Sequence, residues 1–266
     1  MARYSFEKRS ESLKSVCTTL WKRGEAHMNN MIDKEILDAL AENVPLQATI
    51  RLQPTEYVRL RPNVIFDYVY SNMVLHLGCT DQLSLINEKV KSGIYLHTQL
   101  SRIASECLGI DTNKAALEHL YGLGITNIIY ADITKPGIGR ITDEHWDYLI
   151  IAEVLEHIDN PVLFLQDIAL YYKGSIDRLI ITVPNAFGLI NVSQALKNGV
   201  ESINSDHRYW FTPYTICQVA RQAGLVLDEL VMCVYENSAK MIDSNYELLL
   251  DKPLLMDAVL LVAHWE

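Results

Sequence analysis

Residues 74–82 read VLHLGCTDQ. The apolar VLHL segment predicts a buried strand, and Gly78 predicts a tight turn at its carboxyl end. In many α/β proteins such a strand precedes a glycine-rich turn that lets the backbone approach a nucleotide phosphate. Positions 79–82 read CTDQ instead, so the G-x-G-x-x-G pattern of a dinucleotide site is absent. This disfavours a nicotinamide-dependent dehydrogenase and leaves two alternatives, a nucleotide-binding turn that has lost its glycines or a strand end without a ligand.

The sequence on the carboxyl side of this stretch alternates between short apolar strands and amphipathic helices. Such alternation, with strands buried on both faces, predicts a doubly wound, mostly parallel α/β sheet with helices on both sides. Asn160-Pro161 predicts a helix start, with Asn as the cap. A late hairpin-like pair predicts a reversed last strand. The predicted strands are 73–77, 107–110, 127–130, 147–151, 178–183, 226–235 and 257–264, and the predicted helices are 97–105, 113–122, 161–172, 187–198 and 213–223.

The sequence on the amino-terminal side has a different character. Apolar residues follow at roughly helical spacing before several prolines interrupt the pattern. We therefore divide the chain into residues 1–65, a helical extension and candidate substrate lid, and residues 66–266, the domain that carries the alternating pattern.

Composition narrows the class of protein. The chain has 266 residues, 49% of them apolar, and a net charge of −10, which disfavours a nucleic-acid partner. It has no apolar run long enough to span a membrane, and its amino terminus lacks an apolar signal core. Five scattered cysteines without a C-x-x-C pair indicate a reducing, cytoplasmic setting and no structural zinc, so we assign no metal site.

Two loops are expected to flank a ligand crevice. In an open doubly wound sheet, ligands bind beyond the carboxyl ends of the strands, where the strand order reverses. If the first and fourth strands are neighbours, GCTDQ and residues 152–160, AEVLEHIDN, lie beside that crevice.

Two acidic residues end the next strands. Asp111 could accept hydrogen bonds from a ribose diol, or could cap the following helix, a role that Thr112 or Asn113 would fill equally well. In this type of site the acidic residue usually lies about 20 positions after the glycine turn. Asp111 lies 33 positions after Gly78, so we expect extra residues, near DQLSLINEKVKSG, in the loop between them. Asp132 could bind an adenine amino group or cap a turn.

In this order, the motifs VLHLGC, LGIDTN, YADIT, DYLIIAEVLEHIDNP and LIITVPN resemble those of the class I S-adenosylmethionine-dependent methyltransferases. The similarity is greatest to the ubiquinone-biosynthesis type and to uncharacterised bacterial relatives. It covers about residues 70–265, and EVLEHIDNP and DHRYWFTPYTI are its most specific parts. The resemblance implies S-adenosyl-L-methionine as the cofactor.

The resemblance also implies which residues contact the cofactor. Gly78 and Cys79 would lie under its methionine portion, Asp111 would hold the ribose, and Ala152 with Glu153 would line the sulfonium. The adenine would be bordered by Thr112, Asn113, Asp132 and Ile133.

The chain departs from the family pattern in the first strand and its turn. His76 stands where an acid is common, and Thr80 and Gln82 replace glycines. Because the cofactor has no pyrophosphate, close glycine-lined approach is not required. Asp81 could contact the cationic methionine amino group.

Methyl transfer to an oxygen can require removal of a proton. His157, in the loop after the fourth strand, is the favoured base, and His207 is the second candidate. A structural, hydrogen-bonded role is the alternative for each. The neighbouring aromatics at 209–211 are interpreted as a packing cluster, with a substrate wall as the alternative.

We expect an S-adenosylmethionine-dependent methyltransferase that O-methylates a small-molecule acceptor. The alternative is a catalytically silent relative that binds a nucleoside or serves as a partner subunit. We expect no nucleic-acid or membrane partner, and a possible homodimer.

Overall fold

The computed structural model describes residues 50–266. Its described part contains a seven-stranded sheet in the order β3-β2-β1-β4-β5-β7-β6. Strands β1 to β5 are parallel, whereas β7 runs antiparallel to both β5 and β6. The predicted fold class, including the reversed last strand, is confirmed. The strands are β1 (Met73–Leu77), β2 (Glu106–Asp111), β3 (Ile128–Tyr130), β4 (Trp146–Ala152), β5 (Ile176–Pro184), β6 (Leu225–Cys233) and β7 (Ala258–Trp265).

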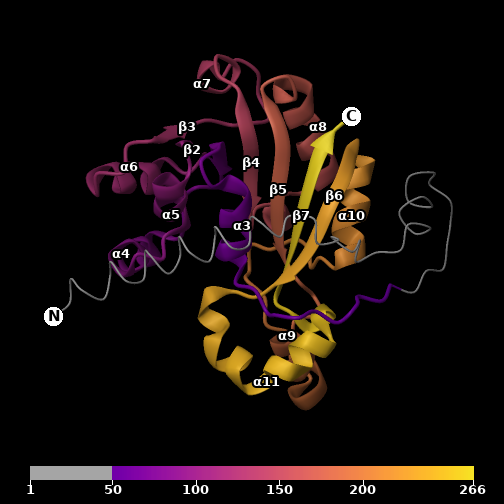
Figure 1. Cartoon of the computed structure of the whole chain (residues 1–266). Helices are drawn as coiled ribbons and strands as arrows, with labels where there is room; N and C mark the ends of the chain where they lie inside the picture. The colour runs from indigo at the N-terminus through magenta and orange to yellow at the C-terminus, as the bar shows by residue number, and fades with distance from the viewer. Residues whose placement is uncertain (1–49) are drawn as a thin grey trace. The chain divides into compact units, whose positions relative to one another are not determined.

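Helices cover both faces of this sheet (Figure 1). Side chains of α8 and α10 pack on one face and those of α3 and α5 on the other. The alternation within β4 shows why both faces are apolar, because Leu149 and Ile151 point to the first face while Ile150 points to the second. The helices are α3 (Arg61–Val69), α4 (Leu83–Ser92), α5 (Leu96–Ile103), α6 (Lys114–Gly122), α7 (Gly139–Thr142), α8 (Pro161–Tyr172), α9 (Leu189–Asn198), α10 (Pro213–Gln222) and α11 (Ala239–Asp251).

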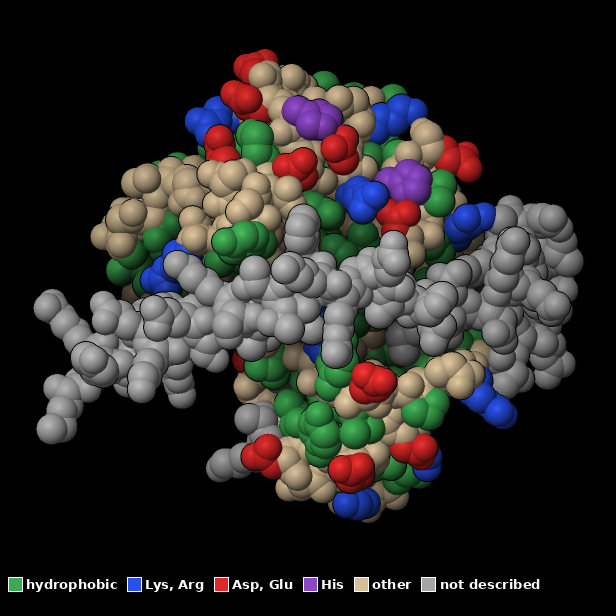
Figure 2. Space-filling view, viewed as in Figure 1, with side chains coloured by type: hydrophobic (Ala, Val, Ile, Leu, Met, Phe, Trp, Pro, Cys, Tyr) green, Lys and Arg blue, Asp and Glu red, His purple; other side chains and the backbone are tan. Residues whose placement is uncertain are grey.

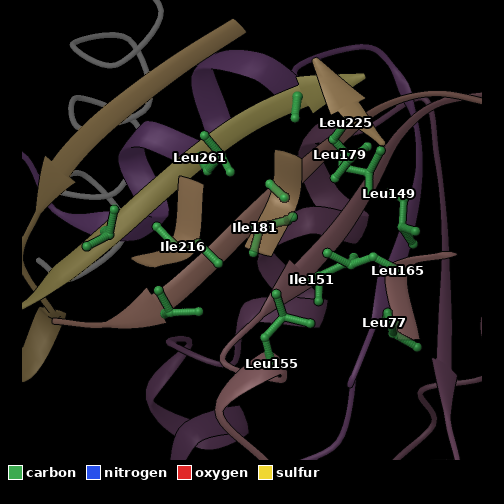
Figure 3. Packing of buried hydrophobic residues seen from close by; sticks show 14 of the residues in the cluster. Leu77, Leu149, Ile151, Leu155, Leu165, Leu179, Ile181, Ile216, Leu225 and Leu261 are labelled. Carbon is green, nitrogen blue, oxygen red and sulfur yellow. The ribbon is translucent and has the colours of Figure 1, made fainter. Parts of the chain in front are cut away.

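The larger core lies under α8 and α10. Figure 3 shows Leu165 of α8 and Ile216 of α10 packed against side chains of the central strands, all fully buried. Burying a side chain of this size stabilises the fold by about 1.5–3 kcal/mol. This core fixes β4 and β5, whose carboxyl ends carry the candidate site.

Local signals fix where several helices begin. Asn160 accepts a hydrogen bond from the Leu163 backbone N–H at 3.0 Å, with Pro161 at the first helical position, as predicted. Asn113 caps α6 in the same way, through the Ala116 N–H at 3.1 Å. These caps place the loops before α6 and α8 beside the ends of β2 and β4.

Four helices differ from the sequence-based prediction, one of them the short α7, where no helix is predicted. The residues at 83–92, expected in a loop, form α4, in which Ile86 is the one buried residue. Such a narrow apolar stripe gives a weak helical pattern. Helix α11 was not predicted, and its pattern is interrupted by a kink at Asn245. Helix α3 crosses the proposed boundary at residue 65, and most of the predicted extension, residues 1–49, lies outside the described residues.

Across residues 50–266, none of the helices combines the length and apolar character needed to cross a membrane.

Candidate functional site

The turn after β1 packs directly against the loop after β4. Gly78 has a φ of +69°, and a Cβ atom there would lie 2.5 Å from Cγ2 of Val154. Its backbone N–H donates to the Ile110 carbonyl at 2.9 Å. Glycine is thus required both for the backbone conformation and for close packing of the two loops that flank the crevice.

Asp111 ties this turn to the end of β2. Its Oδ2 accepts bonds from the Thr80 backbone N–H at 2.9 Å and the Thr80 hydroxyl at 2.8 Å, and its Oδ1 accepts the Asn113 N–H at 2.8 Å. Asn113, rather than Asp111, is the helix cap. Since a carboxylate offers about four acceptor positions, room remains for one hydroxyl. The ribose assignment of Asp111, and the adenine assignments of Thr112 and Asn113, stay predictions.

The other residues of the turn have partners within the protein. Asp81 forms an ion pair with Lys89 of α4 and accepts the Gln82 N–H at 2.8 Å. The Cys79 carbonyl accepts a hydrogen bond from the Tyr95 hydroxyl at 2.7 Å. Burial raises the pKa of the Cys79 thiol. The predicted contact of Asp81 with the cofactor amine would therefore compete with Lys89.

Asp132 forms a local turn after β3. Its Oδ1 accepts the Thr134 backbone N–H at 3.0 Å and the Thr134 hydroxyl at 2.7 Å. Ile133 beside it is buried. The turn-capping role considered for Asp132 is present, and its adenine contact stays a prediction.

The unusual histidine of β1 belongs to a buried pair. His76 stacks on His97 of α5 with ring centroids 5.5 Å apart, and their Nδ1 atoms lie 3.3 Å apart. Burial, first of all, lowers the pKa of His76 well below its usual value and that of His97 to about 4. Both rings are neutral at pH 7 and lie behind the turn rather than at its surface.

Glu153, at the carboxyl end of β4, has an uncommon conformation and three side-chain partners. Its φ is +56°, and Ala152 before it is buried. Its Oε1 accepts the Thr182 hydroxyl at 2.8 Å and lies 3.5 Å from Arg61 Nη1, while its Oε2 accepts the Tyr235 hydroxyl at 2.5 Å. Sequence reasoning missed Arg61 and Tyr235 because they are far from β4 in the chain and match no motif.

Three side chains converge beside Glu153. Glu156, in the 3-10 turn Leu155–His157, is 1% exposed, and neither of its oxygens has a hydrogen-bond partner. His157 and His207 meet it with perpendicular rings 4.6 Å apart. One ligand atom from each of the three lies within 4.8 Å of the others, and within residues 50–266 this is the one such group able to hold a metal ion. The site predicted from the sequence contains no metal and does not include Glu156.

The surroundings orient these groups. Asp206 Oδ2 lies 3.2 Å from His157 Nδ1, and the Glu156 carbonyl accepts the Arg208 N–H at 2.7 Å. Burial, followed by the nearby Glu153, raises the pKa of Glu156 to about 9. His207 Nδ1 is buried without a partner, and burial lowers the pKa of this ring. His207 Nε2 lies 3.2 Å from Asn204 Nδ2, so Nδ1 is the ring atom left free to share a proton with a carboxyl group or to ligate a cation.

The neighbouring aromatic residues divide between packing and hydrogen bonding. Phe211 is buried in the larger core. The Tyr209 hydroxyl donates to the Asp159 carbonyl at 2.6 Å, and Trp210 Nε1 donates to Glu201 at 2.7 Å. These contacts secure the segment that carries His207.

The chain is similar to known methyltransferases at low sequence identity. No family model matches the chain. A ubiquinone biosynthesis O-methyltransferase from Aeromonas salmonicida is 23% identical over 170 residues, which cover 61% of this chain and 66% of that protein. The structure of the small RNA methyltransferase HEN1 superposes with a TM-score of 0.51 and 16% identity, covering 77% of this chain and 25% of that one. An S-adenosylmethionine-dependent methyltransferase from Mesorhizobium loti gives a TM-score of 0.47 at 14% identity, with 76% and 95% of the two chains covered.

The chain spans just under two thirds of the curated relative that it matches, and a quarter of HEN1. The predicted similarity to methyltransferases is confirmed by the sequence similarity to an O-methyltransferase and by the fold shared with HEN1.

Proposed function

We propose that the chain transfers the methyl group of S-adenosylmethionine to a hydroxyl oxygen of a small-molecule acceptor. The observation that carries this proposal is the convergence of Glu156, His157 and His207 at the carboxyl edge of β4. That edge borders the β1–β4 crevice, where ligands bind in doubly wound sheets. The similarity to an O-methyltransferase supports oxygen as the acceptor atom.

The cofactor would lie over the turn after β1. Its methionine portion would rest on Gly78 and Cys79, its ribose on Asp111 and its sulfonium beside Glu153. In the reaction the S–CH₃ bond breaks and an O–CH₃ bond forms. The sulfur keeps the electron pair, which leaves neutral S-adenosylhomocysteine, and the acceptor hydroxyl loses its proton.

Without a cation, the proton would be received by His157, because Glu156, with its pKa raised to about 9, already carries a proton at pH 7. Asp206 holds His157 through Nδ1, which leaves Nε2 available as a base. The Glu156, His157 and His207 group has the donor chemistry of a divalent-cation site, one carboxylate and two imidazoles. A cation held there would stabilise the deprotonated acceptor oxygen and satisfy the otherwise unpartnered Glu156 carboxylate. We therefore include divalent-cation binding in the proposal.

A small molecule fits the charge of this chain better than RNA does. The net charge is −10, and on the face seen in Figure 2, outside the grey atoms, Lys and Arg side chains are scattered among Asp and Glu. Binding of a nucleic-acid backbone requires clustered basic side chains. The expected homodimer stays a prediction.

Titration calorimetry with S-adenosylmethionine and S-adenosylhomocysteine tests the cofactor, and Mn²⁺ titration followed by electron paramagnetic resonance tests the cation. We expect micromolar cofactor binding, and Mn²⁺ binding that Glu156→Gln weakens at least tenfold. His145→Ala is the matched control, since His145 is an exposed histidine that faces Asp177. Cofactor binding with no methyl transfer to any of a panel of phenols and sugar alcohols would favour a catalytically silent relative. Mn²⁺ binding that is equal in Glu156→Gln and the parent protein would contradict the cation site.

A further inference from the structure

A buried arginine reaches the cofactor edge from outside the strand–helix pattern. Arg61 is the first residue of α3, and its side chain is 12% exposed. Its Nη1 lies 3.5 Å from Glu153 and its Nη2 lies 3.8 Å from Glu236, while Cζ sits 5.3 Å from the centre of the Tyr235 ring. Arg61 Nε is buried without a partner. Burying a guanidinium in this way is costly unless an acid compensates its charge.

The backbone holds this arginine in place independently of its side chain. The Arg61 N–H donates to the Val234 carbonyl at 2.8 Å, and the Val234 N–H donates to the Arg59 carbonyl at 3.0 Å. The segment before α3 is thereby paired with the end of β6. The guanidinium is positioned by main-chain pairing rather than by a flexible loop.

Its main counterion is equally well fixed. Glu153 has a left-handed backbone conformation, which costs a non-glycine residue free energy and persists when its surroundings enforce it. Thr182 and Tyr235 both donate hydrogen bonds to its carboxylate, one to each oxygen. Arg61 and Glu153 therefore form a fixed pair of opposite charges with little freedom to rearrange.

The pair lies at the level where a cofactor sulfonium would be. Leu77 of β1 is paired with Ile151 of β4. Cys79 and Glu153 each follow this pair by two residues, so they lie at the same level of the sheet edge. The positive sulfonium is the principal charge difference between S-adenosylmethionine and its product. A fixed charge at this level acts on one of the two ligands and hardly on the other.

We propose that the Arg61–Glu153 pair sets the relative affinity of the site for charged S-adenosylmethionine and neutral S-adenosylhomocysteine. This inference rests on the proposed cofactor site. Glu153 favours the charged cofactor, and Arg61 offsets part of that preference. Arg61 is thus a specificity-determining residue that acts through Glu153.

The test compares both ligands in each variant by titration calorimetry at low ionic strength. Arg61→Met leaves the Glu153 charge uncompensated, so the preference for S-adenosylmethionine over S-adenosylhomocysteine should rise fivefold or more. Glu153→Gln leaves the Arg61 charge uncompensated, so the same preference should fall fivefold or more. The double variant should return to within about twofold of the parent preference, because two opposite charges at the same position are removed together and their effects on the sulfonium cancel.

Arg61→Lys keeps the charge and should keep the preference. If Arg61→Met does not fold, the fall in preference expected for Glu153→Gln still tests the inference. Arg59→Met is the matched control, since Arg59 pairs with Asp67 outside the crevice. Equal loss of affinity for both ligands in Arg61→Met and Glu153→Gln would indicate a purely structural pair and overturn the inference. A parent protein that binds neither ligand would instead overturn the proposed function, and this inference with it.

Discussion

Thr80 donates two hydrogen bonds, from its backbone N–H and its hydroxyl, to the same oxygen of Asp111. The residue that replaces a glycine of the family pattern therefore ties the turn after β1 to the carboxylate expected to bind ribose. The turn is ordered by this side chain as well as by the glycine conformation at 78. Asp111 has a structural task in the protein alone, in addition to its predicted contact with the cofactor.

Asp111→Ala should weaken binding of S-adenosylhomocysteine by about 1.5–3 kcal/mol, the usual cost of removing a charged hydrogen-bond partner. Thr80→Val separates the two tasks of Asp111, because it loosens the turn and leaves the carboxylate. We expect this variant to lose less than half as much affinity as Asp111→Ala. Calorimetry measures both values, and an unchanged dissociation constant in Asp111→Ala would contradict the ribose assignment.

Gly78→Ala should destabilise the protein as well as weaken cofactor binding. The new methyl group meets Val154 Cγ2 at 2.5 Å, and the φ of +69° adds about 1–2 kcal/mol of backbone strain. Val154→Ala in the same chain removes the steric part and leaves the backbone strain. Chemical denaturation of the single and double variants measures the difference. If Val154→Ala recovers no stability, the packing of the two loops is not what requires glycine at 78.

The buried pair of His76 and His97 predicts a pH dependence of stability. Both rings have a lowered pKa in the folded protein, whereas in the unfolded chain each titrates near the usual 6.5. Below that value the unfolded state takes up protons that the folded state does not, so stability falls as the pH falls. With a folded pKa of about 4, His97 alone accounts for a loss of about 3 kcal/mol between pH 6.5 and 4.

Urea denaturation between pH 7.5 and 4.5 tests this dependence. His97→Gln should flatten it, and His119→Gln is a control because His119 is a half-buried histidine outside this pair, with its Nε2 2.9 Å from the Asn87 side chain. A parent curve that stays flat below pH 6.5 would show that the two rings are protonated in the folded protein at little cost.

The sequence predicted the sheet better than the site. Each strand of the sheet is short, apolar and bounded by turn residues, and β1 and α8 match their predicted bounds. The convergence of Glu156 with His207 could not be read from the chain, because 51 positions separate them and a loop-to-loop hydrogen bond from Arg208 brings them together. The position of Arg61 could not be predicted from the sequence either, because backbone pairing of its segment with the end of β6 places it beside Glu153.

His157→Ala should lower methyl transfer by about 10²–10⁴, the usual contribution of a positioned general base, and should leave cofactor affinity nearly unchanged. The ring meets Asp206 through Nδ1, so Nε2 is the atom that would take the acceptor proton. Asp206→Asn keeps the size of that partner and removes its charge, and should cause a smaller loss of rate. His157→Gln should not restore activity, since an amide can hold a hydrogen bond but cannot accept the proton. Transfer of a labelled methyl group to an acceptor found in the phenol and sugar-alcohol panel measures all three rates. Recovery of the rate in His157→Gln would show that His157 only positions groups, and His207, whose ring lies 4.6 Å away, would then be the base to test.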